Sequence, residues 1–166
     1  MALKSPEAIL RNALVANADV QALISGRIYP LRYVGPAPIQ FPLIIWRRAR
    51  VLREMAMGGP VGLPRVTVEM YVYGTTYEAA RDLADKCRRV LDGFAGSLDN
   101  TEVRQASLMD EADDLVEIDG AENSLYLVRQ TYDLFGWRTN TWPRTLRERL
   151  SASPARATPS RISPTQ

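Results

Sequence analysis

The sequence predicts an α+β domain, in which an antiparallel β-sheet has helices packed on one face, followed by an extended basic C-terminal arm. Between residues 63 and 73 apolar and polar residues alternate, which is typical of a strand with one buried face. Between residues 77 and 94 apolar residues recur at helical spacing. The other expected strands follow one another through short turns and the helices are grouped, which favours this fold class.

Two short helices are expected near the N-terminus. Residues 5–7, Ser-Pro-Glu, suit a helix start because they supply a capping residue, a proline at the first helical position and an acid near the positive end of the helix dipole. Asn17 should end this helix. Asp19 should cap a second one, which Gly26 should stop.

The next segment combines a loop, a strand and a turn. Residues 28–29 suggest a short extended piece, and the four prolines between positions 30 and 42 predict a surface loop. Residues 41–54, FPLIIWRRARVLRE, are interpreted as a long strand with no wholly apolar face, so part of it should lie against water or a partner. Residues 55–62, MAMGGPVG, predict a mobile turn before the strand at 63–73.

Gly74 is expected to break that strand, and Thr75 with Glu78 has the spacing of a capping box. Gly93 should stop the helix that follows. Its apolar face comprises Tyr77, Ala80, Leu83, Ala84, Cys87, Val90, Leu91 and Phe94.

Two further strands are expected at residues 101–108 and 124–137, with an acidic, irregular stretch at 109–119 between them. The sequence therefore predicts one domain over residues 1–137 and a Ser/Thr/Pro/Arg-rich extension over 138–166. The extension has six arginines and one glutamate, or +5, whereas the rest has 15 basic and 18 acidic residues, or −3. A basic arm leaving an acidic body suggests contact with a negative surface on the same subunit, a neighbour or nucleic acid.

The composition limits the kinds of catalysis and metal binding that the sequence supports. The chain has no histidine, the usual general base and transition-metal ligand, and its one cysteine excludes an intrachain disulfide. Cys87, on the apolar helix face, is interpreted as a buried structural thiol and not a reactive one. We expect no catalytic residue and no cofactor. No apolar run approaches the ~20 residues that cross a bilayer, so we expect no membrane contact and a location in a cytosol.

The acidic stretch is the one candidate for a metal site. It lacks the glycine and the ligand spacing of an EF-hand loop, so a solvated loop or a patch for a neighbour's arginines is the preferred interpretation. The candidate ligands are Asp110, Glu111, Asp113, Asp114, Glu117 and Asp119.

A basic stripe lies on the strand at 41–54 with a tryptophan beside it. Such a stripe could follow phosphates, but ion pairs within the subunit or with the next one explain it better. Two methionines in the following turn would adapt to imperfectly matched partners, and the basic arm could dock between subunits. The predicted assembly interface therefore comprises Trp46, Arg47, Arg48, Arg50, Arg53, Met55, Met57, Arg144, Arg147 and Arg149.

The order of these parts resembles a known family. A helix pair is followed by RIYP, a proline-rich loop, FPLIIWRR, the unit VTVEMYVYGTTYEAARDLADKCRRVLDGFAG and a late strand SLYLVRQTYDLFGW. In this order, from about residue 8 to residue 137, the chain is similar to the tail terminator, or tail-completion, proteins of long-tailed bacteriophages and gene transfer agents. The extension after residue 137 is longer than this family leads us to expect.

The resemblance implies a structural virion protein without catalytic residues, assembled in the cytoplasm of a bacterial host. It implies a ring, usually a hexamer, that caps the tail tube and joins it to the neck or stopper protein, with DNA passing through the lumen. Three alternatives stay open. They are another neck component such as a head–tail stopper, a small nucleic-acid-binding protein that uses the basic stripe and arm, and a carboxylate-dependent metalloenzyme.

Overall fold

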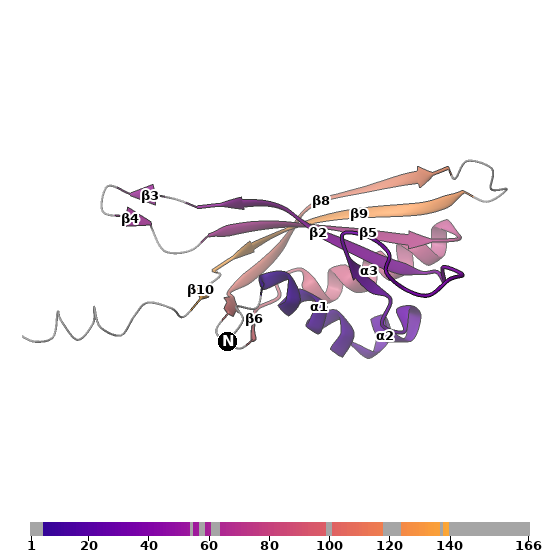
Figure 1. Cartoon of the computed structure of the whole chain (residues 1–166), viewed down its shortest axis with the longest axis horizontal. Coiled ribbons are helices and arrows are strands. Elements are labelled where there is room, and N and C mark those ends of the chain that lie inside the picture. Colours follow the sequence, from indigo (N-terminus) through magenta and orange to yellow (C-terminus); the bar gives the residue numbers. More distant parts are fainter. Residues whose placement is uncertain are drawn as a thin grey trace, which may run out of the picture.

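The computed structural model of the chain describes residues 5–53, 64–98, 101–117 and 124–136, together with the backbone of 55–56, 59–60 and 138–139. Its centre is a five-stranded sheet, and α1 (Pro6–Ala16), α2 (Ala18–Ile24) and α3 (Tyr77–Leu91) lie on one face of it (Figure 1). The predicted α+β class is confirmed. The strands in sheet order are β1 (Ile28–Pro30), β2 (Leu43–Leu52), β5 (Arg65–Gly74), β9 (Leu125–Phe135) and β8 (Gln105–Val116).

Smaller strands flank the main sheet. β3 (Met55–Ala56) and β4 (Gly59–Pro60) pair with each other in the turn between β2 and β5. β6 (Gly96–Leu98), β7 (Thr101–Val103) and β10 (Arg138–Thr139) form a second sheet in the order β10-β7-β6. No helix in the described part of the chain is long and apolar enough to span a bilayer.

The main sheet is mixed, which corrects the prediction of a wholly antiparallel one. The successive pairs β2–β5, β5–β9 and β9–β8 are antiparallel. β1, however, runs parallel to β2, with Ile28 opposite Ile44. The reason is the proline-rich segment at 31–42, which carries the chain back from the end of β1 to the starting edge of β2. Parallel neighbours need such a crossover, which a tight turn cannot supply.

The acidic stretch is also different from the prediction. Residues expected to be an irregular loop form the second half of β8, which pairs with β9 from Gln105 to Val116. The register shifts once, between Leu108 and Asp110. Hydrogen bonding to β9 overrides the low strand propensity of the acids, since that propensity is weak and depends on context. The strand predicted at 101–108 is instead divided at Arg104 between β7 and β8.

The helix caps differ by one or two residues from the expected ones. Thr76, and not Thr75, caps α3 by accepting a hydrogen bond from the amide of Ala79 at 3.2 Å. Asn17 both ends α1, as predicted, and caps α2 in place of Asp19, because its Oδ1 accepts from the amides of Asp19 and Val20. Gly93 follows α3 with a φ of +77°, which suits the predicted stop.

The core lies between α3 and the middle of the sheet. Leu83, Cys87 and Leu91 of α3 are fully buried, and they face the alternating apolar residues of β5. Burying a leucine of this kind stabilises the fold by about 1.5–3 kcal/mol. Gly74 ends β5 where α3 approaches closely, since an added Cβ would lie 2.8 Å from the amide nitrogen of Ala80. The helix is therefore seated directly on the strand that precedes it.

One buried polar network ties α3 to the sheet. Gln130 of β9 is fully buried, and its Nε2 donates to the carbonyl of Ala84 at 2.9 Å and to Glu111 at 2.7 Å. The hydroxyl of Tyr132 donates to the Gln130 Oε1 at 3.0 Å. Because every polar atom of the amide side chain has a partner, burying it carries little desolvation cost.

We predict that Cys87 resists alkylation in the folded chain. Burial raises the pKa of its thiol to about 12, so almost no thiolate forms near pH 8. Iodoacetamide labelling followed by intact mass should be slow without denaturant and complete in urea. Since the chain has one cysteine, each labelled molecule reports on this site alone. Rapid labelling of the folded chain would contradict the core position of Cys87.

Candidate assembly interface

Strand β2 carries four of the predicted interface residues, Trp46, Arg47, Arg48 and Arg50, and a fifth, Arg53, follows directly. The burial of its residues changes along its length. Leu43 and Ile44 are buried, Ile45 and Trp46 are half-buried, and residues 47–50 are exposed. The exposed half lies beyond the short strand β1, which pairs with β2 at residues 44–46. The strand predicted to have no wholly apolar face is therefore buried at its start and exposed to solvent in its second half.

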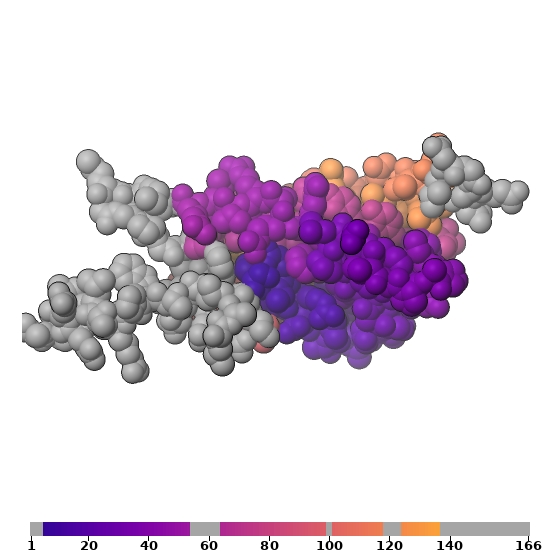
Figure 2. All heavy atoms as spheres, viewed as in Figure 1, coloured from indigo at the N-terminus to yellow at the C-terminus, as the bar shows by residue number. Residues whose placement is uncertain are grey.

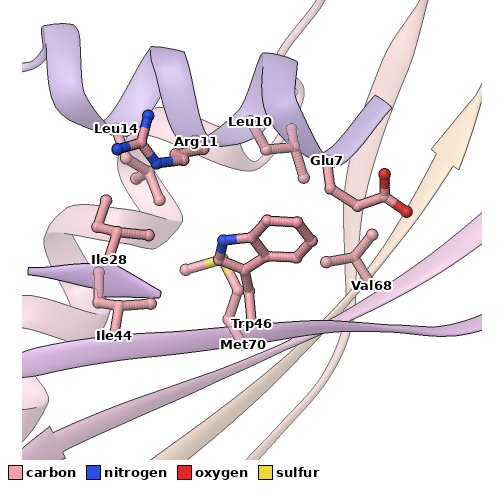
Figure 3. Close-up of a pocket in the computed structure, with 9 residues that line it drawn as sticks. All are labelled: Glu7, Leu10, Arg11, Leu14, Ile28, Ile44, Trp46, Val68 and Met70. Atoms are coloured by element: carbon pink, nitrogen blue, oxygen red, sulfur yellow. The ribbon is translucent and has the colours of Figure 1, made fainter. Parts of the chain in front are cut away.

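Trp46 lies on the helix side of the sheet. Its ring occupies a narrow crevice between β2, β5 and the N-terminal half of α1 (Figure 3), with a cavity volume of about 10 Å³ beside it. The ring packs against the core, and its buried Nε1 has no hydrogen-bond partner among the described residues. This crevice has at most the room of one water molecule. Its lining comprises Glu7, Leu10, Arg11, Leu14, Ile28, Ile44, Trp46, Val68 and Met70.

Arg48 lies on the same side and holds the start of α1 to the sheet. Its Nε and Nη2 donate to the two carboxylate oxygens of Glu7, the second bond measuring 2.8 Å. Glu7 is 2% exposed. Burial alone would raise the pKa of Glu7, but the hydrogen bonds from Arg48, the helix backbone and Ser5 outweigh it, and the pKa lies below its usual value.

Arg47 points to the opposite side, which we call the open face because no helix in the described part of the chain covers it (Figure 1). Its Nε donates to Glu69 at 2.6 Å, and its guanidinium lies 5.5 Å from the ring centroid of Tyr71. Tyr71 also donates to Glu69, at 2.6 Å. The hydrogen bond from Tyr71, together with the hydrogen bond and positive charge of Arg47, keeps the pKa of Glu69 below its usual value despite partial burial.

A second polar cluster on the open face was not predicted from the sequence. The Asp133 carboxylate is 5% exposed and accepts from Arg65 Nε at 2.8 Å and from the hydroxyl of Thr67 at 2.6 Å. The Arg65 guanidinium also stacks over Phe135 at 4.8 Å. The signal that could have drawn attention to it is an aspartate between Tyr132 and the apolar pair Leu134 and Phe135 near the end of a strand, since a buried carboxylate needs partners.

The remaining predicted residues are spread along the chain. Arg50 is exposed on β2 and Arg53 just beyond it, and neither forms an ion pair with another described residue. Met55 contributes backbone to β3. Met57, Arg144, Arg147 and Arg149 lie outside the described residues. The structure thus places the predicted β2 residues on one strand but on two faces of the sheet, with Trp46 and Arg48 on the helix side and Arg47 on the open face. The part played by the arm stays a prediction.

The carboxylates of β8 bind side chains of the same subunit in several places. Arg81 of α3 lies 2.8 Å from Glu111 and 3.0 Å from Asp113, and Tyr77 donates to Asp113 at 2.8 Å. Asp110 lies 3.7 Å from Arg129. Among the described residues no group of three or more potential ligands is arranged to hold a metal ion, and Asp119 lies outside them.

Comparison with known proteins identifies the family. Residues 8–133 match the family described as "Tail completion protein gp17". The chain belongs to this family. The resemblance inferred from the sequence is confirmed, and the protein is a tail completion protein, a structural component of a virion. No curated protein sequence matches the chain.

A solved structure is similar to it in fold. A chain of the structure titled "Virion of native gene transfer agent (GTA) particle" superposes with a TM-score of 0.62 at 15% identity. The match covers 80% of this chain and 96% of that chain. At this identity the likeness establishes the fold, which supports the architecture of the tail completion protein described above.

We predict that Glu7→Gln destabilises the protein by about 1.5 kcal/mol at neutral pH, the low end for a hydrogen bond to a charged group, because the Arg48 guanidinium is partly solvated. A carboxylate with a lowered pKa in the folded state stabilises the fold above its unfolded pKa, near 4.5, and this contribution is lost as the pH falls through the folded value. Urea unfolding should therefore show that the difference in unfolding free energy between the wild type and Glu7→Gln is smaller at pH 3 than at pH 7.

Asp82→Asn is the matched control, since it removes an exposed carboxylate that pairs with Lys86 on the surface of α3. Its effect should stay within about 0.5 kcal/mol. Equal effects of the two substitutions, or a Glu7→Gln effect that does not change with pH, would contradict the role given to the Glu7–Arg48 pair.

Proposed function

We propose that this tail completion protein is a tail terminator. Copies form a closed ring, six-membered as in the family it resembles, that caps the finished tail tube and joins it to a neck or stopper protein. DNA passes through the lumen without sequence-specific contacts, and the subunit has no catalytic role. The observation that carries the proposal is the family match over residues 8–133, which runs from the first turn of α1 almost to the end of β9.

The geometry supports a subunit that completes itself against copies of itself. Helices and apolar residues close one face of the sheet, whereas the open face holds arginine–carboxylate pairs and half-buried tyrosines. The edge strands carry exposed charges. In the space-filling view the indigo residues of α1 and α2 lie below the magenta and orange residues of the strands, with the purple segment that contains β1 and the proline-rich loop between them (Figure 2). Surfaces of this kind suit contacts with neighbouring subunits.

Within the proposed ring, residues 1–137 form the terminator domain and residues 138–166 an arm that docks on a neighbouring subunit through its arginines. The Met55–Gly62 turn contacts the tail tube or an adjacent subunit. The nucleic-acid-binding alternative has less support, because Arg47 and Arg48 already bind carboxylates of their own subunit. Phosphate contacts would have to replace those pairs, which costs the energy of breaking them.

We predict that replacing residues 55–62 with a two-residue Asn-Gly turn leaves the domain folded and abolishes tail joining. The turn is expected to be tolerated because β2 and β5 already pair from Leu43–Tyr73 to Leu52–Arg65. The measurement is the fraction of particles with joined heads and tails, counted by electron microscopy in a host that supplies the variant.

The matched variants are Met55→Ala with Met57→Ala, which should reduce joining, and Val34→Ala, which trims an exposed apolar side chain elsewhere and should not. Thermal unfolding of each purified variant checks that it folds. Normal joining by the shortened protein would show that the turn has no part in attachment. Tails that join heads in the complete absence of the protein would contradict the terminator function itself.

A further inference from the structure

The two edges of the main sheet are each occupied along only part of their length. On β2, Ile44 and Trp46 bond to the segment before and after β1, through Ile44 N to Arg27 O at 3.0 Å and Leu31 N to Trp46 O at 2.8 Å. No described strand pairs with the same edge over residues 47–52. This stretch is an open strand edge of six residues, Arg47–Leu52.

The β8 edge is occupied at the opposite end of the sheet. Ala106 exchanges two hydrogen bonds of 2.8 Å with Gly93 and Phe94, and the amide of Leu108 donates to Asp92 at 3.0 Å. From Met109 to Glu117 no described strand or loop pairs with this edge. Unpaired strand edges expose rows of backbone donors and acceptors, which are templates for pairing with another chain.

The two open segments carry opposite charge. The β2 segment and the residue after it present Arg50 and Arg53, which have no ion-pair partner among the described residues. The β8 segment presents the exposed acids Asp114 and Glu117, which also lack a cationic partner there, and Asp110, whose contact with Arg129 is long. Both segments also expose apolar side chains: Leu52 on β2, and Met109 and Leu115 on β8.

We infer that these two segments bind each other between neighbouring copies, so that the basic edge Arg47–Arg53 of one copy docks on the acidic edge Met109–Glu117 of the next. The inference rests on the proposed ring and names the contact that builds it. The contact is head to tail, because its two surfaces are different, and repeated contacts of this type generate a ring when the rotation closes.

Strand direction agrees with this contact. β2, β5, β9 and β8 alternate in direction, so a neighbour's β2 added beside β8 in the same orientation continues the antiparallel pattern. Arg50 pairs in register with Thr67, and Asp114 with Leu127. Thr67 and Leu127 both lie on the side opposite to the helices, so Arg50 and Asp114 share one face of the continued sheet.

The positions of the open segments also fit a closed sheet. Followed across the sheet through the strand registers, Arg48 lies level with Leu108 and Arg50 with Ser107. The centre of the open β8 segment is therefore displaced along the strands from the centre of the open β2 segment by roughly five residues, or ~17 Å. The four strands β2, β5, β9 and β8 cover ~19 Å across the sheet. If each neighbour is offset by ~17 Å along the strands for every ~19 Å across them, the strands incline by roughly 40° to the ring axis. Closed sheets have strand tilts of about 35–45°.

The other explanation for charged edges is that they prevent pairing, as charges on exposed edge strands often do. The two explanations differ in their response to charge reversal. R50E/R53E makes both edges acidic and D114R/E117R makes both edges basic, so either variant alone should repel its own copies. In an equimolar mixture every contact between unlike variants again joins opposite charges, and a ring with an even number of subunits closes by alternation.

The experiment is native mass spectrometry of the full chain, alone and in mixtures, at low and high salt. We expect wild-type protein to form rings, each variant alone to associate about tenfold or more weakly, and the mixture to recover the rings. R32E/R89E is the matched control, since it makes the same charge change at exposed positions that lie on neither open edge and should behave as wild type. High salt should weaken the wild-type contact.

Rings formed equally well by both reversed variants would overturn the edge contact and leave the proposed ring standing. Failure of the mixture to recover association, while each variant remains folded by circular dichroism, would also overturn it. A wild-type chain that stays monomeric at its highest soluble concentration would do the same, and the tail-joining assay would then still test the proposed function on its own.

Discussion

The structure depends on one packing arrangement, the seating of α3 on β5 and β9. Leu83, Cys87 and Leu91 bury one side of the helix, and Gly74 allows the helix to begin close to the strand that precedes it. The buried Gln130 fixes the position of the helix by bonding to the carbonyl of Ala84. With the helices gathered on this face, the opposite face and the two sheet edges are left for polar and charged groups.

Those polar groups are arranged in two ways. Charges that lie against α1 or between the two central strands are neutralised within the subunit, as Glu7 of α1 is by Arg48 and Asp133 of β9 by Arg65 of β5. Charges at the ends of the edge strands, such as Arg50 and Asp114, have no such partner among the described residues. A subunit that satisfies its inner charges and leaves its edge charges available is suited to repeated assembly, which agrees with its membership of the tail completion protein family.

The parts of the fold that the sequence predicted are those set by local periodicity. The alternation from Val66 to Val72 and the apolar face of α3 sufficed to place the central strand and helix. The strand character of the acidic half of β8 could not be predicted, because it comes from pairing with β9, which is decided by the rest of the chain. The parallel pairing of β1 has the same origin.

For the interface, composition indicated the arginines of β2 but not their roles. Arg48 binds Glu7, which lies 41 residues earlier in the chain, and Arg47 binds Glu69 across a strand pair, so no local spacing reveals either partner. Arg50 and Arg53 were grouped with them in the sequence, and the structure separates them by their lack of a described partner. The contributions predicted for Met57 and the C-terminal arginines stay predictions.

The most direct test of the account is a cryo-electron microscopy reconstruction of the intact virion in which this chain is located. The account predicts one closed ring of copies between the last ring of the tail tube and the neck, with an open channel along its axis. A single copy, or copies placed at the far end of the tail or inside the head, would contradict it.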